Sequence, residues 1–171
     1  MLPSISGQNE KYNFSDLEVL IVDDNQHMHT ILRDILLGMR IKKIKHAYSS
    51  SEAMKKVEAG VPDVMLVDLL MKPVSGFDFI RSVRRHERQE ISLSAILVLT
   101  SFSSAELVRR ARDSGANELL CKPVSVSGLV DRLTHMRDHP RQFVKTETYI
   151  GPDRRRAVRE FEGPDRRKKQ D

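Results

Sequence analysis

Short apolar runs recur along the chain and predict the strands of a buried sheet. Four of them are four to six residues long, nearly continuous and rich in branched side chains, and they span residues 17–22, 63–67, 95–99 and 117–121. A weaker fifth run spans residues 44–47. Runs of this kind are typical of strands in parallel sheets, which are covered on both faces.

Apolar residues at helical spacing fill the stretches between these runs. The stripes lie within residues 28–39, 53–57, 77–83, 107–111 and 126–136. Gly60 and Gly115 are typical helix stops, and Ser103 with Glu106 forms a predicted capping box ahead of the fourth helix. The β-α alternation repeats five times over about residues 17–138, which predicts an α/β fold with a parallel sheet, right-handed crossovers and helices on both faces.

The predicted domain covers residues 17–138, between an N-terminal extension of residues 1–16 and a tail of residues 139–171. Its 39% hydrophobic and 31% charged residues are typical of a globular class. No apolar run approaches the ~18 residues of a membrane helix and the N-terminus shows no signal pattern, so we expect a cytoplasmic protein without membrane partners. The single Cys121 permits no internal disulfide, and we interpret it as a small buried hydrophobe.

Basic charge is concentrated in the tail. Residues 139–171 hold ten Lys and Arg against six Asp and Glu, so the remaining 138 residues carry little of the total net charge of +5. A near-neutral body argues against a dedicated nucleic-acid-binding domain, so we do not expect nucleic acid as a partner. Salt-sensitive binding of DNA by the tail is an alternative.

Two copies of one motif lie in the tail, twelve residues apart: Tyr149-Ile-Gly-Pro-Asp-Arg-Arg155 and Phe161-Glu-Gly-Pro-Asp-Arg-Arg167. Gly-Pro-Asp favours a turn that would present an aromatic on one side and paired Arg on the other. The tail is therefore either a flexible, solvated extension or a docking element for a protein surface. Because the apolar pattern ends at Met136, removal of residues 140–171 is expected to leave the domain folded.

Five polar side chains follow the predicted strands at the points where those strands end: Asp23, Asp24, Asp68, Thr100 and Lys122. In a sheet of order 2-1-3-4-5, the carboxyl ends of these strands surround one pocket. Three carboxylates at one spot repel each other unless a cation joins them, and Mg²⁺ prefers such oxygen ligands. A carboxylate nucleophile with a metal, an ammonium and a hydroxyl suits transfer of a phosphoryl group onto Asp68.

Each of these residues alone has an ordinary structural interpretation. Asp-Asp-Asn after a strand is commonly an N-cap cluster, and Lys122-Pro123 alone is a turn. The function depends on all five meeting at one pocket. His27 and His29 are two residues apart and do not share a helix face, so we expect them to be solvated and not to bind metal.

Four sequence blocks resemble the signature of the response-regulator receiver family of bacterial two-component systems. These blocks are Leu20-Ile-Val-Asp-Asp-Asn25, Val67-Asp-Leu-Leu-Met71 followed by Gly76, Val98-Leu-Thr-Ser101, and Cys121-Lys-Pro-Val124. The resemblance implies a flavodoxin-like (βα)₅ fold that is doubly wound. It also implies phosphorylation by a histidine kinase or a histidine phosphotransfer protein.

The same resemblance implies a role for each residue of the pocket. Asp68 matches the phosphoacceptor, and Thr100 and Lys122 match the switch hydroxyl and the phosphoryl-binding lysine. Mg²⁺ would be bound by the pair Asp23 and Asp24, by Asp68 and by the backbone carbonyl of Leu70. The Lys122–Pro123 bond would be cis.

Three departures from the family pattern concern four positions. Lys72 replaces a usual proline, and Leu119 replaces the usual aromatic whose rotation reports the switch. In the family, the side chains at the positions of Leu70 and Phe102 flank the path of the hydrolytic water, and two apolar side chains cannot orient that water. We therefore expect a long-lived aspartyl phosphate.

We predict a phosphorelay response regulator that is not an enzyme and that signals by binding a downstream protein partner, as a monomer or a phosphorylation-dependent dimer. A phosphate sink or shuttle without its own output is an alternative. A phosphatase of the haloacid-dehalogenase kind is a further one, but that class carries Asp-x-Asp after its first strand, where this chain has Asp23-Asp24-Asn25.

Overall fold

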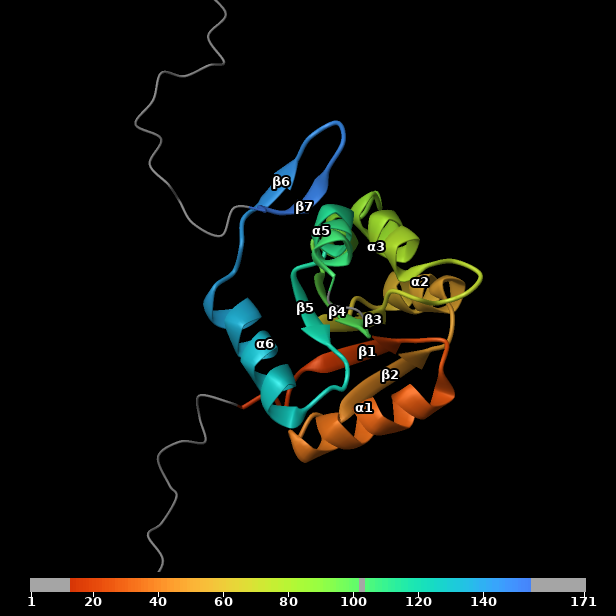
Figure 1. Cartoon of the computed structure of the whole chain (residues 1–171), viewed down its shortest axis with the longest axis vertical. Coiled ribbons are helices and arrows are strands. Elements are labelled where there is room, and N and C mark those ends of the chain that lie inside the picture. Colours follow the sequence, from red (N-terminus) through yellow and green to blue (C-terminus); the bar gives the residue numbers. More distant parts are fainter. Residues whose placement is uncertain (1–12, 102–103, 155–171) are drawn as a thin grey trace, which may run out of the picture.

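The computed structural model describes residues 13–101 and 104–154. Five parallel strands form one sheet in the order β2-β1-β3-β4-β5, which confirms the predicted order (Figure 1). Helices pack on both faces of this sheet, which confirms the doubly wound, flavodoxin-like α/β fold. The strands are β1 (Glu18–Val22), β2 (Lys43–Ala47), β3 (Val64–Asp68), β4 (Ala95–Thr100) and β5 (Glu118–Cys121).

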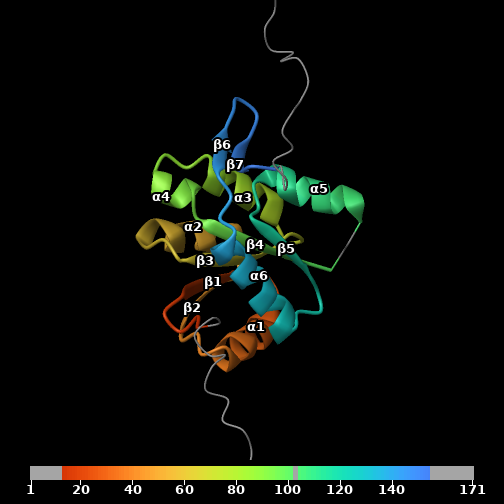
Figure 2. The same ribbon diagram turned by 90° about the vertical axis from the view of Figure 1, so that its left-hand side faces the viewer.

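The helices divide into two layers. Helices α1 and α6 cover one face of the sheet, and α2, α3 and α5 cover the other (Figures 1 and 2). A short α4, absent from the predicted elements, lies between α3 and β4. The helices are α1 (Gln26–Gly38), α2 (Ser50–Ala59), α3 (Gly76–Arg84), α4 (Gln89–Ser92), α5 (Ala105–Ser114) and α6 (Val126–Asp138).

Each central strand feeds both cores by the alternation of its side chains. In β1, Leu20 and Val22 pack under α2 and α3, whereas Val19 and Ile21 pack under α1 and α6. All four are fully buried. Burial of one such side chain is worth about 1.5–3 kcal/mol, so the sheet is fixed in this register by both faces at once.

Polar caps set the start of the helices. The Asn25 side chain accepts the His27 N–H at the start of α1, and Ser104 accepts the Leu107 N–H at the start of α5. The cap of α5 is therefore Ser104, one residue after the predicted Ser103, which lies outside the described residues. Gly115 ends α5 as predicted, with a positive φ of 104° that favours glycine.

The tail contains structure that the sequence did not predict. Residues Phe143–Lys145 (β6) and Ile150–Pro152 (β7) form an antiparallel hairpin beside the ends of α3 and α5 (Figures 1 and 2). A flexible extension therefore does not describe this part of the tail. The second motif copy, residues 161–167, lies outside the described residues.

The first motif copy forms a compact turn at the end of the hairpin. Tyr149 is buried, and its hydroxyl donates to the Pro152 carbonyl at 2.7 Å. Its ring lies so close to Gly151 that a Cβ there would approach the Tyr149 oxygen to 2.7 Å. The Arg154 guanidinium lies over the same ring at 4.2 Å. The motif thus folds into a turn around its own aromatic.

Arg84 is the residue of the domain on which the hairpin packs. It is only 2% exposed, and it donates to the carbonyls of Gly115, Ser92 and Ser94 and to the Asn117 side chain at 2.7–2.9 Å. Its guanidinium also lies 5.0 Å from the ring centre of Phe143 on β6. Burial lowers the pKa of Arg84 to about 9, so the side chain remains charged at neutral pH.

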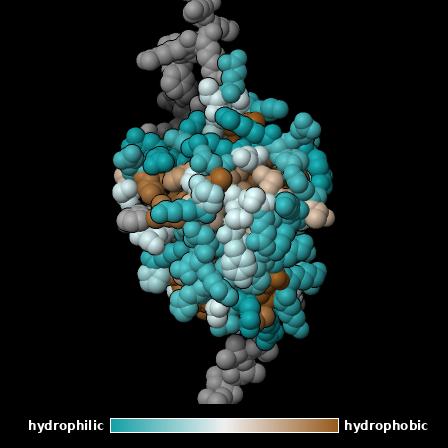
Figure 3. Space-filling view, turned by 90° about the vertical axis from the view of Figure 1, so that its right-hand side faces the viewer, coloured by the Kyte–Doolittle hydropathy of each residue, from teal (hydrophilic) through white to brown (hydrophobic). Residues whose placement is uncertain are grey.

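The outer surface on the α2 side is mainly hydrophilic, with small separate apolar areas (Figure 3). Within residues 13–101 and 104–154, no helix is long and apolar enough to cross a membrane.

Candidate functional site

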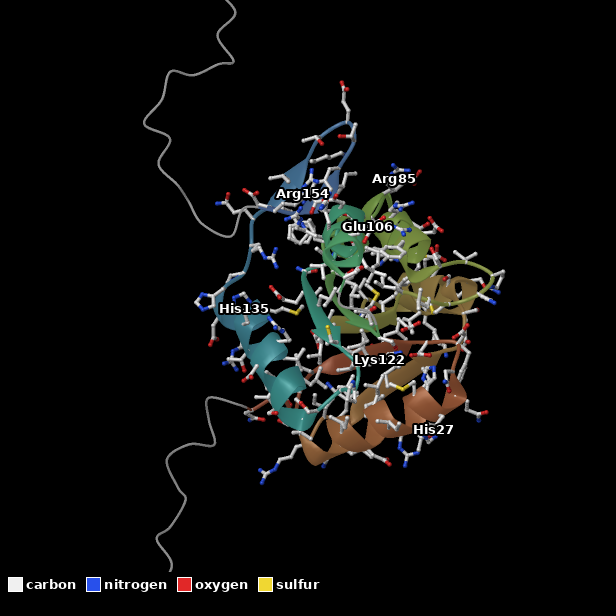
Figure 4. The ribbon with its side chains drawn as sticks, in the orientation of Figure 1. His27, Arg85, Glu106, Lys122, His135 and Arg154 are labelled. Atoms are coloured by element: carbon white, nitrogen blue, oxygen red, sulfur yellow. The ribbon has the colours of Figure 1, made fainter. Side chains whose placement is uncertain are left out.

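The carboxyl ends of β1, β3 and β5 bring three charged side chains into contact. Lys122 Nζ donates to Asp68 Oδ1 at 2.7 Å and to Asp23 Oδ2 at 3.0 Å. The two carboxylates are 9% or less exposed, and the lysine side chain is 15% exposed. These residues lie far apart in sequence, and the order of the strands in the sheet brings them together. Figure 4 shows Lys122 just beyond the end of β5.

The backbone around Asp68 fixes the direction of its carboxylate. The Leu70 N–H donates to Asp68 Oδ2 at 2.8 Å, while Lys122 holds the other oxygen. Gly76, at the start of α3, packs directly against this turn. A Cβ on Gly76 would lie 2.0 Å from the Asp68 carbonyl oxygen, so the site requires glycine there.

The charge of Lys122 is maintained by its partners. Burial alone lowers its pKa, but the hydrogen bonds and negative charges of Asp68 and Asp23 outweigh that effect and raise the pKa above its ordinary value. The ammonium is therefore present throughout the neutral range. Two carboxylates share this one positive charge, which leaves the pocket net negative.

The other two predicted site residues lie at the edges of this contact. Thr100 is fully buried at the end of β4, and its carbonyl accepts the Lys122 N–H at 2.7 Å. Asp24 is exposed, and its Oδ2 accepts the Lys72 N–H at 3.0 Å. The backbone at Lys72, where the family pattern has proline, thus supplies a hydrogen bond that proline cannot make.

The donor set fits a hard divalent cation with few protein ligands. Among the described residues, no group of three acidic, His or Cys side chains is close enough to hold a metal by itself. Mg²⁺ usually keeps several waters and takes one or two carboxylates. Asp23 and Asp68 provide two buried carboxylates, with Asp24 beside them at the surface. The net negative charge of the pocket favours such an ion, and the Leu70 carbonyl remains a predicted ligand.

The remaining positions of the family pattern give a mixed result. The Lys122–Pro123 bond is cis as predicted, and Lys72–Pro73 is a second cis bond that the sequence did not predict. Leu119 is half-buried and packs against the core on the α5 face. Leu70 is 50% exposed beside the pocket, and Phe102 lies outside the described residues.

His29 supports the site from behind, contrary to the prediction that it is solvated. It is buried, and its Nε2 donates to the Asp23 carbonyl at 2.8 Å, since a carbonyl only accepts. Its Nδ1 lies 3.0 Å from Nδ1 of His46, whose pKa is lowered by burial and then by the charges of nearby residues, with His29 first among them. The spacing of His29 to the buried Leu32 and Leu36 is the signal that could have revealed it.

Two further interpretations are tested by exposure. His27 is exposed on the outer side of α1, as predicted (Figure 4). Cys121 is exposed, so its interpretation as a buried hydrophobe is wrong. It ends β5, which is an edge strand with a neighbour on one side only, and this position leaves its side chain uncovered.

Comparisons with known proteins agree with this geometry. Residues 19–134 match the family described as the response regulator receiver domain. The transcriptional regulatory protein PdtaR of Mycobacterium tuberculosis is 32% identical over 112 residues, which are 66% of this chain and 52% of that protein. The chain therefore spans about half the length of that relative. A probable chemotaxis protein CheY of Rhizobium etli is 30% identical over 110 residues, which are 64% of this chain and 84% of that protein.

Solved structures show the same fold. The chemotaxis protein CheY4 of Vibrio cholerae superposes with a TM-score of 0.64 at 27% identity, covering 70% of this chain and 97% of that one. A putative response regulator from Chloroflexus aurantiacus gives a TM-score of 0.65 at 28% identity, covering 70% and 96%. Because the family match spans most of the chain and includes Asp23, Asp68 and Lys122, this chain belongs to the response regulator receiver domain family, which acts in two-component signalling.

Proposed function

We propose that Asp68 accepts a phosphoryl group from a phosphohistidine of a histidine kinase or a histidine phosphotransfer protein, and that the phosphorylated domain signals by binding a downstream protein. The observation that carries this proposal is the bridge from the Lys122 ammonium to Asp68 and Asp23, at 2.7 and 3.0 Å. An ammonium at this place can pair with the Asp68 carboxylate before the transfer and with an oxygen of the phosphoryl group after it.

The residues of the pocket divide the chemistry among them. An oxygen of Asp68 forms a bond to phosphorus as the phosphorus–nitrogen bond of the donor breaks, and the imidazole leaves with the electron pair. The Leu70 N–H and Lys122 hold the carboxylate in one orientation, so little ordering remains to be done at the transition state. The Thr100 hydroxyl would donate to an oxygen of the bound phosphoryl group.

Mg²⁺ would be held by Asp23 and Asp68, with Asp24 and the Leu70 carbonyl close by. When bound, it neutralises charge on the phosphoryl oxygens. This donor set belongs to a family known to bind Mg²⁺. We expect phosphorylation to require Mg²⁺ or Mn²⁺, and Asp24→Ala to weaken Mg²⁺ binding, which a titration of the metal would measure.

The direct test is phosphorylation of the full chain by a small-molecule donor, followed on a phosphate-affinity gel. Asp68→Ala and Asp68→Asn should both lose labelling entirely. Asp131→Asn removes an exposed acid on α6 and serves as the matched control, which should label at the normal rate. Labelling of Asp68→Ala at the normal rate would overturn the assignment.

A phosphate sink or shuttle uses the same pocket and differs only in its output. A phosphorylation-dependent partner would favour the signalling role. Rapid return of the phosphoryl group to a histidine protein, without any such partner, would favour the sink.

A further inference from the structure

A groove lies between α5 and β5, away from the phosphorylation pocket. It has a volume of about 300 Å³. Val108 and Ala111 of α5 form one wall, Leu119 of β5 forms the floor, and Arg141 of the tail closes the amino end of β5. This size is at the lower limit of the ~300–1,000 Å³ that encloses a small ligand, so it suits a single large side chain.

The described chain ends beside this groove. Arg154, the last described residue, donates to Asp113 on α5 at 2.8 Å and stacks on Tyr149. Arg112, the neighbour of Asp113, lines the groove. Figure 4 shows Arg154 between the foot of the hairpin and α5. The residues that follow therefore start close to the groove.

The sequence beyond Arg154 provides one candidate for the groove. Phe161 is the only aromatic residue after Tyr149, and it is the first residue of the second motif copy. Seven residues of extended chain reach ~23 Å, whereas a ten-residue helix such as α5 is ~15 Å long. Phe161 can therefore reach any part of the groove from Arg154.

The chemistry of the two motif copies differs in the way that this placement requires. Tyr149, in the first copy, satisfies its hydroxyl with the Pro152 carbonyl inside its own turn. Phe161 has no hydroxyl and needs no polar partner, which suits the apolar part of the groove formed by Val108, Ala111 and Leu119. The polar lining residues are Arg112 on α5 and Asn117, Glu118 and Arg141 at the amino end of β5.

The charges on each side also match. Glu160 and Glu162 flank Phe161 in the sequence. Arg112 is exposed on α5 and lines the groove, four residues after Val108. Opposite charges on the rim favour one direction of binding while the apolar floor holds the ring.

We propose that the second motif copy docks on its own domain, with Phe161 in the α5–β5 groove, while Arg154 of the first copy anchors the tail at Asp113, beside the Arg84 site that Phe143 covers. The two copies then have different roles: the first fixes the tail to the domain, and the second fills the groove with its aromatic ring. While Phe161 is bound, the tail covers the α5–β5 face, and a protein that binds this face must first displace Phe161.

The test uses the full chain with Phe161→Trp. The protein contains no tryptophan, so the emission of this side chain is read without background. A docked ring should give blue-shifted emission that is independent of protein concentration. Val108→Glu in the same background places a carboxylate in the groove, where it repels Glu160 and Glu162, and should shift the emission to that of a solvated ring.

Leu37→Glu is the matched control, since Leu37 is as exposed as Val108 but lies on α1, and it should leave the emission blue-shifted. Solvated emission in the Phe161→Trp protein overturns the proposal. Blue-shifted emission that survives Val108→Glu places the ring elsewhere and also overturns it. A blue shift that disappears on dilution moves the contact to a second copy of the chain and overturns docking within one molecule.

Discussion

Each end of the sheet holds a cation among polar partners, and the two cations have different kinds of partners. Lys122, at the carboxyl end, is held by two carboxylates. Arg84, at the amino end, is held by three backbone carbonyls and one amide oxygen. A charged partner can be exchanged for a phosphoryl group or a metal, whereas a backbone carbonyl stays where the fold places it. A cation among oxygen acceptors therefore supports the proposed phosphoryl transfer at one end of the sheet and the stability of the fold at the other.

Arg84→Ala should have the largest effect on stability. It leaves several buried acceptors without a donor, and we expect a loss of about 4 kcal/mol in the free energy of unfolding, measured by urea denaturation. Arg85→Ala removes an exposed neighbour of the same type and should change stability little. Labelling at Asp68 should persist in the folded fraction of Arg84→Ala. Loss of labelling there without loss of stability would break the comparison between the two ends.

Gly76→Ala tests whether the carboxyl end also depends on its backbone. The added Cβ would overlap the Asp68 carbonyl oxygen, so we expect a loss of about 3 kcal/mol in the free energy of unfolding and slower labelling. Gly38→Ala, at the end of α1, meets no atom within 4 Å and serves as the control. Equal unfolding curves for the two variants would contradict the close approach at Gly76.

Two truncations separate the hairpin from the rest of the tail. Removal of residues 140–171 exposes the Arg84 site and the buried Glu118, which Arg141 pairs at 2.6 Å. We expect a loss of about 2 kcal/mol, which revises the expectation that the domain does not need its tail. Removal of residues 155–171 alone should lower the midpoint of thermal unfolding less, because it leaves the contacts of Arg84 and Glu118 in place. If both truncations behave like the full chain, the amino-end contacts contribute nothing to stability.

Leu70→Asn should have the smallest effect, and it acts only at the carboxyl end. An amide beside the pocket can orient a water, so dephosphorylation should become about tenfold faster, equivalent to ~1.4 kcal/mol in the barrier. Val74→Asn, in the same loop, is the control, because Val74 is similarly exposed. Decay of labelled protein over time measures both. An unchanged rate of dephosphorylation in Leu70→Asn would show that the Leu70 side chain does not prolong the lifetime of the aspartyl phosphate.

The pocket was predictable because its residues follow directly from the strand pattern. Asp23, Asp68 and Lys122 each come where an apolar run stops, and parallel strands place such positions on one edge. The two helical layers followed from the alternation of strands and helices, whereas the strand order is that of the flavodoxin-like fold, which the family resemblance implies.

The amino end was not predictable for the opposite reason. Strands β6 and β7 have three residues each, too few for a period-2 pattern to show. Arg84 looks like an ordinary polar residue at the end of a helix, and only the carbonyls of distant segments make its burial possible. His29 was misjudged in the same way, because its partners Asp23 and His46 come from other elements.

The position of the hairpin at the end of the described chain also has a consequence for synthesis. Phe143 leaves the ribosome about 60 residues after Arg84, when every strand of the main sheet has already been made. Domains tend to fold as units as they emerge, so the guanidinium is first enclosed by carbonyls and Asn117 alone, and the hairpin closes over it afterwards. A nascent chain therefore completes the pocket that would be phosphorylated before it completes the opposite end.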